Sequence, residues 1–540
     1  MKRTTTVLAC SAAAVTALAT AGAATASTTP APASGAQAAA VSGERRAAAV
    51  EHATGLLKKA PSAAAAGADD AFAVRDVLVD ADGTEHVRYV RSHQGLPVLG
   101  GDLVVHSSKD GALKGVSKTQ RAPLQLSTKA ATTAAQARAA ALEAFPGKAD
   151  SVGAAQLVIT TRAAAPALAW AVVVTGTNPE GGPSELRTVL RAADLSVLET
   201  VEGIHTAKPG TGGTTGTNAA ATGNTLYVGA VPLTTTLSSG TYSLKDATRG
   251  SQTTSDLAGR TSGTGTVVTS TTPTFGNGST SSRATVAADA AYGVAETWDY
   301  FKESFGRNGI AGDGKGAPSR VHYGNRYNNA FWSDSCFCMT FGDGDGVQFN
   351  PLVSLDVAGH EMTHGITSRS AGLTYSGESG GLNEATSDVF GSMVEFTANS
   401  SQDVPDFDIS EEIVPAGDAP LRYMAQPSRD GASKDCWYSG VGSIDVHYSS
   451  GVGNHAFFLM AQGSSSSYGT SPTCGAPAVT GIGNTAAAAV WYRALTVYMT
   501  SGTDYHGART AMLNAATDLY GAGSTQYAGV NAAWAGAGVV

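Results

Sequence analysis

Residues 357–366 read VAGHEMTHGI and place two histidines and a glutamate within five positions of a predicted helix. Residues four positions apart share one face of a helix, so His360 and His364 point their rings at a common centre. Two imidazoles at this spacing can bind zinc, and Glu361 beside them can take a proton from water that the metal acidifies. This feature constrains the fold more than any other, because a second element must supply the missing ligand.

A third protein ligand decides whether the site is catalytic, since a catalytic zinc takes three protein ligands and leaves one position open. One class of zinc protease places a third histidine six residues after the second, but Thr367 and Ser370 exclude that pattern here. The stretch GGLNEATSD offers Glu384 instead, on a second predicted helix, with Asp388 four residues later on the same face. Asp388 is then placed to accept the outer N–H of a ligand histidine. The alternative for this acidic pair is a solvated helix face.

The N-terminus predicts export, because Lys2 and Arg3 precede an apolar run and a small-residue cleavage site at 24–26. This is the pattern of a secretory signal peptide over residues 1–26. Cys10 allows a lipoprotein signal as the alternative, although the apolar run before it is short. No later run of the sequence approaches the ~18 apolar residues of a transmembrane helix. The net charge of −9 argues against nucleic acid. We therefore expect a secreted, extracellular protein with neither membrane nor nucleic-acid partners.

The four cysteines after the signal peptide predict disulfides, because an even number in an exported chain favours pairing. Three connectivities exist. We favour Cys436 with Cys474 and Cys336 with Cys338, although the second pair closes a tight ring. A thiolate metal site is the alternative, but the cysteines lack the two-residue spacing typical of zinc clusters.

The length of 540 residues predicts more than one domain. Residues 27–70 are rich in Ala, Ser and Pro and are predicted to be a poorly ordered, low-complexity segment. Residues 71–207 alternate like strands around an Ala-rich helix, which predicts a small α+β region. A Gly/Thr-rich linker follows at 208–224. Residues 225–358 predict a β-rich lobe and residues 359–540 an α-helical lobe, so the fold class is α+β.

The segments DVAGHEMTHGIT, GGLNEATSD and DVHYSSGVGNHAF resemble the thermolysin-type neutral metallopeptidases, the gluzincins named for their glutamate ligand. Before them, HVRYVRSHQGLPVLGGDLVVH at 86–106 resembles the fungalysin/thermolysin-type propeptide. The resemblance implies a two-lobed catalytic domain with zinc between the lobes. It also implies a propeptide of two small α+β modules over residues 71–207, which acts as intramolecular inhibitor and chaperone, with residues 208–224 as the maturation region. The protein is expected to be monomeric and to act on proteins and peptides.

Carried over position by position, the resemblance implies that His360, His364 and Glu384 bind one zinc ion. Glu361 is then the general base, which removes a proton from the attacking water and can return it to the leaving amine. The implied activity is hydrolysis of internal peptide bonds.

The resemblance also implies residues that contact the substrate. His447 and Tyr375 would stabilise the negative charge that develops on the scissile carbonyl oxygen. Asn329, the carbonyl of Ala330 and Arg422 would hold the substrate backbone.

One position departs from the family pattern. In the family an aspartate five residues before the oxyanion histidine orients it, whereas this chain has Gly442 there. Asp445 lies nearby, but the sequence does not assign it that role, because its orientation relative to His447 is not fixed. The partner of His447 therefore stays open.

A second group of carboxylates matches the family's paired calcium site and predicts two structural Ca²⁺ ions. Its members are Asp356, Glu395, Asp406, Asp408 and Glu411. Close-packed carboxylates need a cation between them. Asp356 lies in an apolar stretch one turn before His360, where an unpaired carboxylate is costly. The alternative is a plain acidic loop.

The resemblance also places five apolar residues around a specificity pocket on the leaving-group side. They are Phe349, Leu352, Val357, Ile409 and Leu421. Such a pocket predicts a preference for a bulky hydrophobic residue just after the cut bond, the P1' position. Each residue could equally belong to the core.

Two other functions compete with the endopeptidase. A zinc aminopeptidase would need an acidic pocket for a free amine, and the sequence shows none. A catalytically silent binding protein with the same fold is the other alternative, but such a protein would have no need of Glu361.

Overall fold

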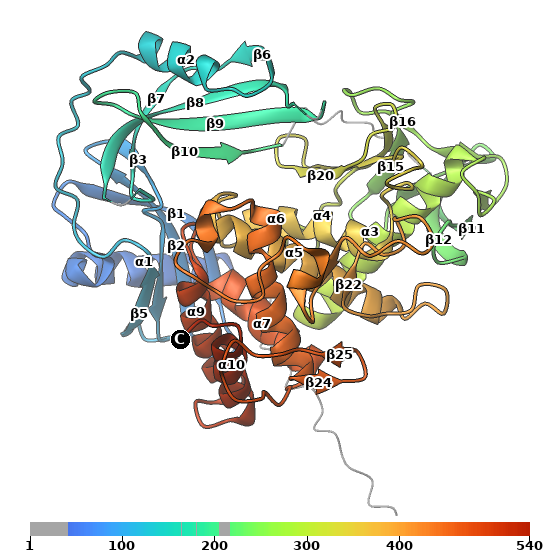
Figure 1. Cartoon of the computed structure of the whole chain (residues 1–540). Coiled ribbons are helices and arrows are strands. Elements are labelled where there is room, and N and C mark those ends of the chain that lie inside the picture. Colours follow the sequence, from blue (N-terminus) through green and yellow to red (C-terminus); the bar gives the residue numbers. More distant parts are fainter. Residues whose placement is uncertain (1–41, 164, 180, 205–215) are drawn as a thin grey trace, which may run out of the picture.

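A computed structural model describes residues 42–163, 165–179, 181–204 and 216–540. The predicted signal peptide, Cys10 and the start of the predicted low-complexity segment lie outside these residues. Figure 1 shows a strand-rich region from the early part of the chain lying over and beside a body in which the C-terminal helices gather. In the described part of the chain, no helix combines the length and the apolarity needed to cross a membrane.

The region predicted to be a propeptide, described over residues 42–204 and called the pro-region below, is built on one ten-stranded sheet. The main strand order is β10-β9-β8-β7-β3-β2-β4-β5, with β1 beside β2 and β6 beside β8. A parallel contact joins the two predicted modules, in which Val98 of β3 pairs with Ile159 of β7. The strands are β1 (Asp70–Val79), β2 (Glu85–His93), β3 (Leu96–Leu99), β4 (Leu103–Ser107), β5 (Leu113–Lys118), β6 (Lys148–Val152), β7 (Gln156–Thr160), β8 (Ala167–Thr177), β9 (Pro183–Arg191) and β10 (Val197–Glu202).

The prediction of poor order for residues 27–70 is wrong over the part that the structure describes. Helix α1 (Gly43–Lys59) begins after Ser42, whose hydroxyl accepts a hydrogen bond from the backbone of the first turn. Ala49, Ala53 and Leu57 recur every four residues and are buried in one cluster with side chains of β1, β2 and β4. The alanine-rich composition concealed this spacing, since small side chains give little contrast between the two faces of a helix. The second helix, α2 (Ala134–Glu143), packs on the other half of the sheet.

The prediction of a linker over residues 208–224 is wrong over its second half. Residues 205–215 lie outside the described residues, but Thr217–Asn224 form β11, which pairs antiparallel with β12 along its whole length. Gly223 is needed there, because a Cβ at this position would lie 2.9 Å from Leu233 and 3.1 Å from Ala288 of helix α3 (Arg283–Phe305). The small residues that suggested a flexible linker therefore allow a strand to approach a helix closely.

The β-rich lobe consists of two sheets and the helix α3 (Arg283–Phe305). Their strand orders are β17-β13-β12-β11-β18 and β14-β15-β19-β21-β20, with β16 beside β15. The strands are β11 (Thr217–Asn224), β12 (Ala230–Ser238), β13 (Thr241–Ser243), β14 (Lys245–Asp246), β15 (Gln252–Asp256), β16 (Thr266–Val267), β17 (Thr269–Ser270), β18 (Thr274–Phe275), β19 (Ser319–Tyr323), β20 (Ala330–Ser333) and β21 (Cys338–Gly342).

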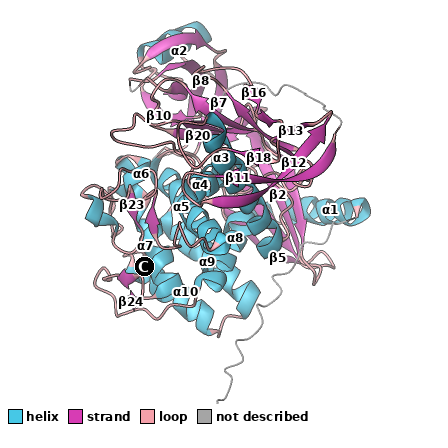
Figure 2. Ribbon diagram, turned by 90° about the vertical axis from the view of Figure 1, so that its right-hand side faces the viewer, coloured by secondary structure: helices cyan, strands magenta, loops and turns pink. Residues whose placement is uncertain are grey.

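The α-helical lobe packs its helices around buried aromatic residues such as Phe390, Phe457, Trp491 and Trp534. Figure 2 shows these helices below strands β7, β8 and β10 of the pro-region. Its elements are α4 (Leu355–Ser368), α5 (Gly377–Ala398), α6 (Val446–Ser449), α7 (Gly451–Gln462), α8 (Asn484–Arg493), the π-helix η4 (Ala494–Tyr498), α9 (Tyr505–Tyr520), α10 (Thr525–Gly536) and the short strands β22 (Asp408–Ile409), β23 (Arg422–Tyr423), β24 (Ser465–Ser466) and β25 (Gly469–Thr470). The predicted lobe boundary at 358–359 falls inside α4, so this helix belongs to the junction of the two lobes.

Helices α4 and α5 approach each other unusually closely. A Cβ on Gly359 would lie 2.9 Å from the Cα of Gly391, and a Cβ on Gly391 would lie 2.6 Å from the carbonyl oxygen of Asp356. Any larger side chain at these glycines would push the helices apart. This close crossing brings side chains of the two helices to one point at the junction of the two lobes.

Both favoured cysteine pairs are disulfide-bonded. The Cα atoms are 5.9 Å apart in Cys436–Cys474 and 5.2 Å apart in Cys336–Cys338. The first bond closes a loop of the α-helical lobe, and the second lies at the turn between β20 and β21.

Candidate metal and catalytic site

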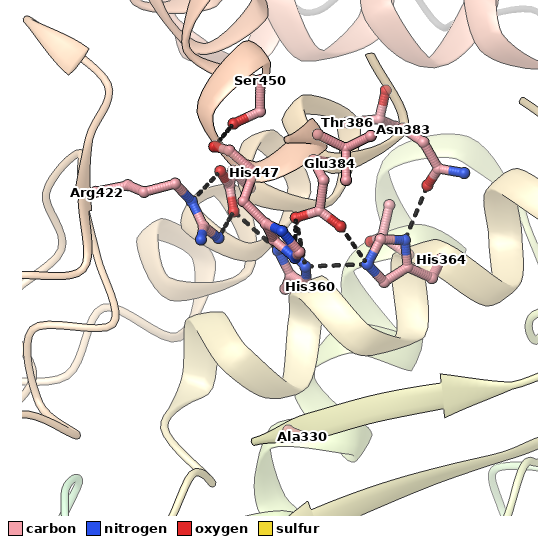
Figure 3. A network of polar contacts seen from close by, with 12 residues as sticks. Ala330, His360, His364, Asn383, Glu384, Thr386, Arg422, His447 and Ser450 are labelled. Atoms are coloured by element: carbon pink, nitrogen blue, oxygen red, sulfur yellow. Dashed lines mark hydrogen bonds and ion pairs between the residues drawn. The ribbon is translucent and has the colours of Figure 1, made fainter. Parts of the chain in front are cut away.

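Helices α4 and α5 bring the three predicted zinc ligands together (Figure 3). The Nε2 atoms of His360 and His364, one turn apart on α4, lie 3.0 Å from each other. Glu384 of α5 faces them, with carboxylate oxygens 3.5 Å from His360 Nε2 and 3.3 Å from His364 Nε2. One ligand atom from each of the three side chains lies within 4.8 Å of the other two. Two imidazoles and one carboxylate are a donor set that zinc takes in catalytic sites.

The outer nitrogen of each histidine is held by a neighbour on α5. His360 Nδ1 lies 2.8 Å from Asp388 Oδ1, and His364 Nδ1 lies 2.8 Å from Asn383 Oδ1. Both oxygens accept, so each Nδ1 carries the proton and each Nε2 keeps its lone pair for a metal. Asp388 lies where the sequence placed it. Asn383 was not predicted. The one sequence feature that points to it is its position directly before Glu384.

The electrostatics of the three side chains suit a cation. Glu384 is fully buried, and its Oε2 has no hydrogen-bond partner in the structure. Burial alone would raise the pKa of Glu384, but His447, His360 and His364 hold it well below its usual value. Burial would lower the pKa of His364, but Glu384 raises it to about 9. A positive charge between the two imidazoles and the Glu384 carboxylate therefore stabilises the buried carboxylate. A divalent metal ion supplies such a charge, so the residues fit zinc.

Asp388 is the centre of a buried polar network. Besides His360, it accepts hydrogen bonds from Arg422 Nη2 at 2.6 Å, Arg422 Nε at 2.8 Å and Asn454 Nδ2 at 2.8 Å. Burial would raise the pKa of Asp388, but Arg422 and His360 lower it far below its usual value. Arg422 was expected to hold substrate backbone. In the structure its Nε and Nη2 both face Asp388, although the side chain also lines the cavity described below.

Tyr375 and His447 lie beside Glu384. The Tyr375 hydroxyl donates to Glu384 Oε1, and its oxygen lies 3.2 Å from His447 Nε2. The Nδ1 of His447 lies 2.7 Å from Asp445 Oδ1, which also accepts the backbone N–H of His447 at 2.9 Å. The structure thus places Asp445 in the orienting position that the sequence left open. Asp445 acts as N-cap of α6, and this short helix fixes the direction that the sequence could not.

The predicted base, Glu361, is buried on α4 and borders the same cavity. Burial raises the pKa of its carboxyl group, while His360 and His364 oppose this rise. A carboxylate with a raised pKa accepts a proton more readily at neutral pH.

A cavity of about 1070 Å³ lies between the two lobes and the pro-region and is lined by these residues. Its walls include Asn329 and Ala330, both predicted to hold substrate; Ala330 lies on β20 below the histidines in Figure 3. Four predicted pocket residues also line it, namely Leu352, Val357, Ile409 and Leu421. Phe349 packs partly buried against the core and is not among the residues that line the cavity, so its place in the pocket stays a prediction. Ile413 takes a place in the wall that the sequence did not predict.

A second group of carboxylates meets beside α5. Oxygen atoms of Glu395, Asp403 and Glu411 lie within 4.8 Å of one another. All six carboxylate oxygens of these residues are buried and have no hydrogen-bond partner in the structure. Burial and the nearby Asp356 raise the pKa of Asp403 to about 6 and that of Glu411 to about 11. Such a group stays ionised together when a divalent cation lies between its members, so the residues fit calcium.

The other predicted calcium ligands take different positions. Asp356 is buried nearby, but its oxygens already accept from Ser354 Oγ at 2.6 Å and from the backbone N–H of Ser410 at 2.6 Å. Asp406 accepts the backbone N–H of Asp408 at 2.7 Å. Burial raises the pKa of Asp406 and of Asp408, the latter to about 6.

Two acidic residues of this group were missed. Asp403 is one of the three converging carboxylates, and Glu412 lies close enough to raise the pKa of Glu411. Both belong to the acidic run SSQDVPDFDISEE. Within such a run the sequence does not show which carboxylates turn inward.

Family models match most of the described chain. The model described as "Thermolysin metallopeptidase, catalytic domain" matches residues 220–368, and "Thermolysin metallopeptidase, alpha-helical domain" matches residues 371–539. The "Fungalysin/Thermolysin Propeptide Motif" matches residues 70–120, in the first module of the pro-region.

Named relatives cover both the pro-region and the two lobes. A "Transglutaminase-activating metalloprotease" of Streptomyces mobaraensis is 45% identical over 480 residues, which are 87% of this chain and 61% of that protein. A "Bacillolysin" of Bacillus cereus is 34% identical over 87% of this chain and 86% of the relative. A "Thermolysin" of Bacillus sp. (strain EA1) is 36% identical over 84% of this chain and 83% of the relative.

Proposed function

This chain belongs to the thermolysin family of metallopeptidases, and from this membership we propose a secreted zinc endopeptidase that cuts internal peptide bonds before bulky apolar residues. The general activity, hydrolysis of peptide bonds by a metallopeptidase, follows from the family. The extracellular location, the P1' preference and the residue roles given below are parts of the proposal.

One observation supports this function most. His360, His364 and Glu384 converge at the wall of a cavity that Glu361 also lines. A donor set of this kind with a carboxylate next to it can serve both metal binding and proton transfer in one place.

Zinc, when bound, supplies a Lewis acid that polarises the scissile carbonyl and lowers the pKa of water. Glu361 removes the proton of the attacking water and passes it to the leaving amine. Burial prepares Glu361 for this by raising its pKa. His360 and His364 are kept in the correct tautomer by Asp388 and Asn383.

His447 donates its Nε2–H to the negative charge that develops on the carbonyl oxygen. This requires a doubly protonated ring, because Nδ1–H already donates to Asp445. Burial would lower the pKa of His447, but Glu384 and Asp445 raise it, which supports the charged form. Tyr375 can turn from Glu384 toward the same oxygen.

The pro-region blocks the cavity in this proposal. Its residues Glu202, Gly203 and Ile204 line the cavity together with the site residues. Ile204 packs against an aromatic cluster that includes Phe331 of β20. Arg75, which also lines the cavity, donates to the carbonyl oxygen of Ser368 at 2.6 Å. A substrate chain would need the space that these residues take.

Two calcium ions complete the proposed set of metals. The orphaned carboxylates of Glu395, Asp403 and Glu411 support one ion directly, and the adjacent acidic side chains support the second. The ions tie the 403–412 loop to α5 and thereby keep one wall of the cavity in place.

The P1' preference is tested with internally quenched peptides, blocked at both ends, that differ in the residue after the scissile bond. We expect kcat/KM to be roughly 10–200-fold higher for Leu or Phe than for Gly. Leu421→Ala removes part of the apolar wall and lowers the rate for Leu without changing that for Gly. Val347→Ala is the matched control, because Val347 is exposed and does not line the cavity. Equal rates for Leu and Gly would contradict the proposed pocket.

The precursor is tested by N-terminal sequencing of the active secreted enzyme. We expect a start between Thr206 and Thr217, because β11 begins at Thr217 and belongs to the β-rich lobe. An active enzyme that begins at Ser27 would refute the role of the pro-region as inhibitor.

A further inference from the structure

The pro-region also contacts the α-helical lobe at a distance from the cavity, at the junction of α8 and η4. Arg493 of α8 donates two hydrogen bonds to Asp80, at 2.7 and 2.6 Å. Arg88 of β2 donates to the carbonyl oxygens of Met499 at 2.8 Å and Thr496 at 3.3 Å. Figure 1 shows the blue strands β2 and β5 of the pro-region beside α9, and Figure 2 shows the same two strands beside α8 and α9. None of these five residues lines the cavity, so the proposed chemistry does not use them.

Two buried histidines join this contact to the interior of the pro-region sheet. His86 of β2 and His106 of β4 are opposite each other in the sheet, and their Nδ1 atoms lie 2.7 Å apart. His86 Nε2 lies 2.9 Å from Asp80 Oδ2, the carboxylate that binds Arg493. His106 Nε2 lies 2.9 Å from the hydroxyl of Ser117 on β5. Both rings are almost completely buried.

The hydrogen-bond directions fix how many protons this chain of groups accepts. With Ser117 donating to His106 Nε2, His106 Nδ1–H donates to His86 Nδ1, and His86 Nε2–H donates to Asp80. Every atom is then satisfied while both rings are neutral. Because the two Nδ1 atoms face each other, one of them can carry a proton and the other must accept it. If both rings were charged, two N–H groups would oppose each other across 2.7 Å.

Positive charges and an aromatic ring surround the two imidazoles. An Nη2 atom of Arg493 approaches His86 Nε2 to 3.2 Å, and the ring of Tyr498 covers His106 with centroids 5.0 Å apart. Burial, followed by the neighbouring His86, Arg493 and Arg88, lowers the pKa of His106 well below its usual value.

The carboxylates around the two rings are already bound to guanidinium groups. Asp80 accepts both hydrogen bonds of Arg493, and Asp518 of α9 lies 2.8 Å from the same guanidinium. Asp102 lies 4.0 Å from Arg88 and accepts the backbone N–H of Ser501. Asp80 is therefore shared between Arg493 and His86, whereas the direct contacts of His106 are the ring of His86 and the hydroxyl of Ser117.

We propose that the His86–His106 pair is an acid-sensitive latch, which holds the pro-region on the α-helical lobe and weakens when the surroundings acidify. When the pro-region undocks, Arg493 and Tyr498 no longer cover the rings. Each imidazole then meets water, in which a histidine titrates near pH 6.5. The undocked state thus binds a proton that the buried His106 ring refuses in the docked state. Docking is complete above about pH 6.5 and weakens up to tenfold per pH unit below it for each proton taken up.

Hydrogen–deuterium exchange on the full chain carrying Glu361→Gln measures this docking, since the substitution prevents self-cleavage. The readout is the protection of amides 494–503, corrected for the pH dependence of intrinsic exchange. We expect constant protection from pH 7.5 to 7 and a fall of roughly tenfold between pH 6.5 and 5.5. Amides of the buried helix α7 should keep their protection. Constant protection of 494–503 throughout this range overturns the latch.

Two variants separate the latch from a general effect of acid. In His86→Gln/His106→Gln the side chains can hydrogen-bond but do not titrate, so the protection should no longer depend on pH. His52→Gln is the matched control: His52 contacts Glu85 within the same region and should leave the response unchanged. A pH response that persists in the double variant overturns the proposal.

A spectroscopic readout decides the case in which the double variant fails to fold. Nuclear magnetic resonance of ¹³Cε1-labelled histidine in the Glu361→Gln chain should show a ring that titrates well below pH 6.5. If both rings of the pair titrate near pH 6.5, the latch is overturned. The inference requires docking and not catalysis. An inactive wild-type enzyme with a normal exchange response would therefore refute the proposed function alone.

Discussion

Removing calcium should destabilise the fold by an amount that follows from the number of bound ions. Glu395, Asp403 and Glu411 bring six buried carboxylate oxygens together without hydrogen-bond partners, so the folded state alone offers the site. A ligand that binds the folded state stabilises it by about 1.4 kcal/mol for each tenfold rise in concentration above the dissociation constant. Two ions should give about 2.7 kcal/mol per tenfold rise. Over a hundredfold range this is about 5 kcal/mol, which approaches the total stability of many domains.

Urea unfolding of the Glu361→Gln chain, followed by tryptophan fluorescence, measures this slope at a series of free calcium concentrations with zinc held constant. Asp403→Asn should shift the dependence to calcium concentrations at least about tenfold higher, because one converging carboxylate is lost. Asp418→Asn is the control, since Asp418 is exposed and outside the group. A free energy of unfolding that does not change with calcium would refute the reasoning. A slope near 1.4 kcal/mol per tenfold rise in free calcium would indicate one bound ion instead of two.

Three further predictions concern the network around the site and the α-helical lobe. Asp388→Asn should weaken zinc binding about 10–100-fold in a chelator competition assay, because the amide cannot accept all four hydrogen bonds that the carboxylate accepts; unchanged affinity would contradict this. Asp445→Ala should lower kcat about 10–100-fold at unchanged zinc content, since the charged form of the oxyanion histidine loses its partner; a full rate would show that orientation comes from elsewhere. Replacing Cys436 and Cys474 by serine opens a loop with a sequence separation of 38 and should lower the free energy of unfolding by about 4 kcal/mol in denaturant titrations. A loss near zero would contradict the entropic argument.

The positions of the proposed zinc ligands were predictable because each depends on local periodicity. The four-residue spacing of His360 and His364, and of Glu384 and Asp388, needs nothing more than a helix. What the sequence could not provide is the crossing of the two helices, which depends on small residues meeting in space. Asn383 was missed for this reason, since an amide shows no ligand-like pattern until the helices are placed.

Loops and weak patterns account for the remaining differences. Asp403 lies in an acidic run in which inward and outward carboxylates look alike, and Asp445 depends on the direction of a four-residue helix. Helix α1 and strand β11 were hidden by alanine, glycine and threonine, whose small side chains carry little periodic contrast. Phe349 was assigned by position alone, and a pocket wall is decided by tertiary packing.

The central claim is tested most directly by comparing the processed wild-type enzyme with Glu361→Gln. Cleavage of a peptide blocked at both ends and the zinc content per chain are measured for both proteins. The account predicts one zinc per chain in each, and a rate about 10²–10⁴-fold lower in the variant, because glutamine keeps the shape but cannot take the proton. Equal rates at equal zinc content would contradict the role of Glu361, and an inactive wild type with full zinc content would favour a binding protein.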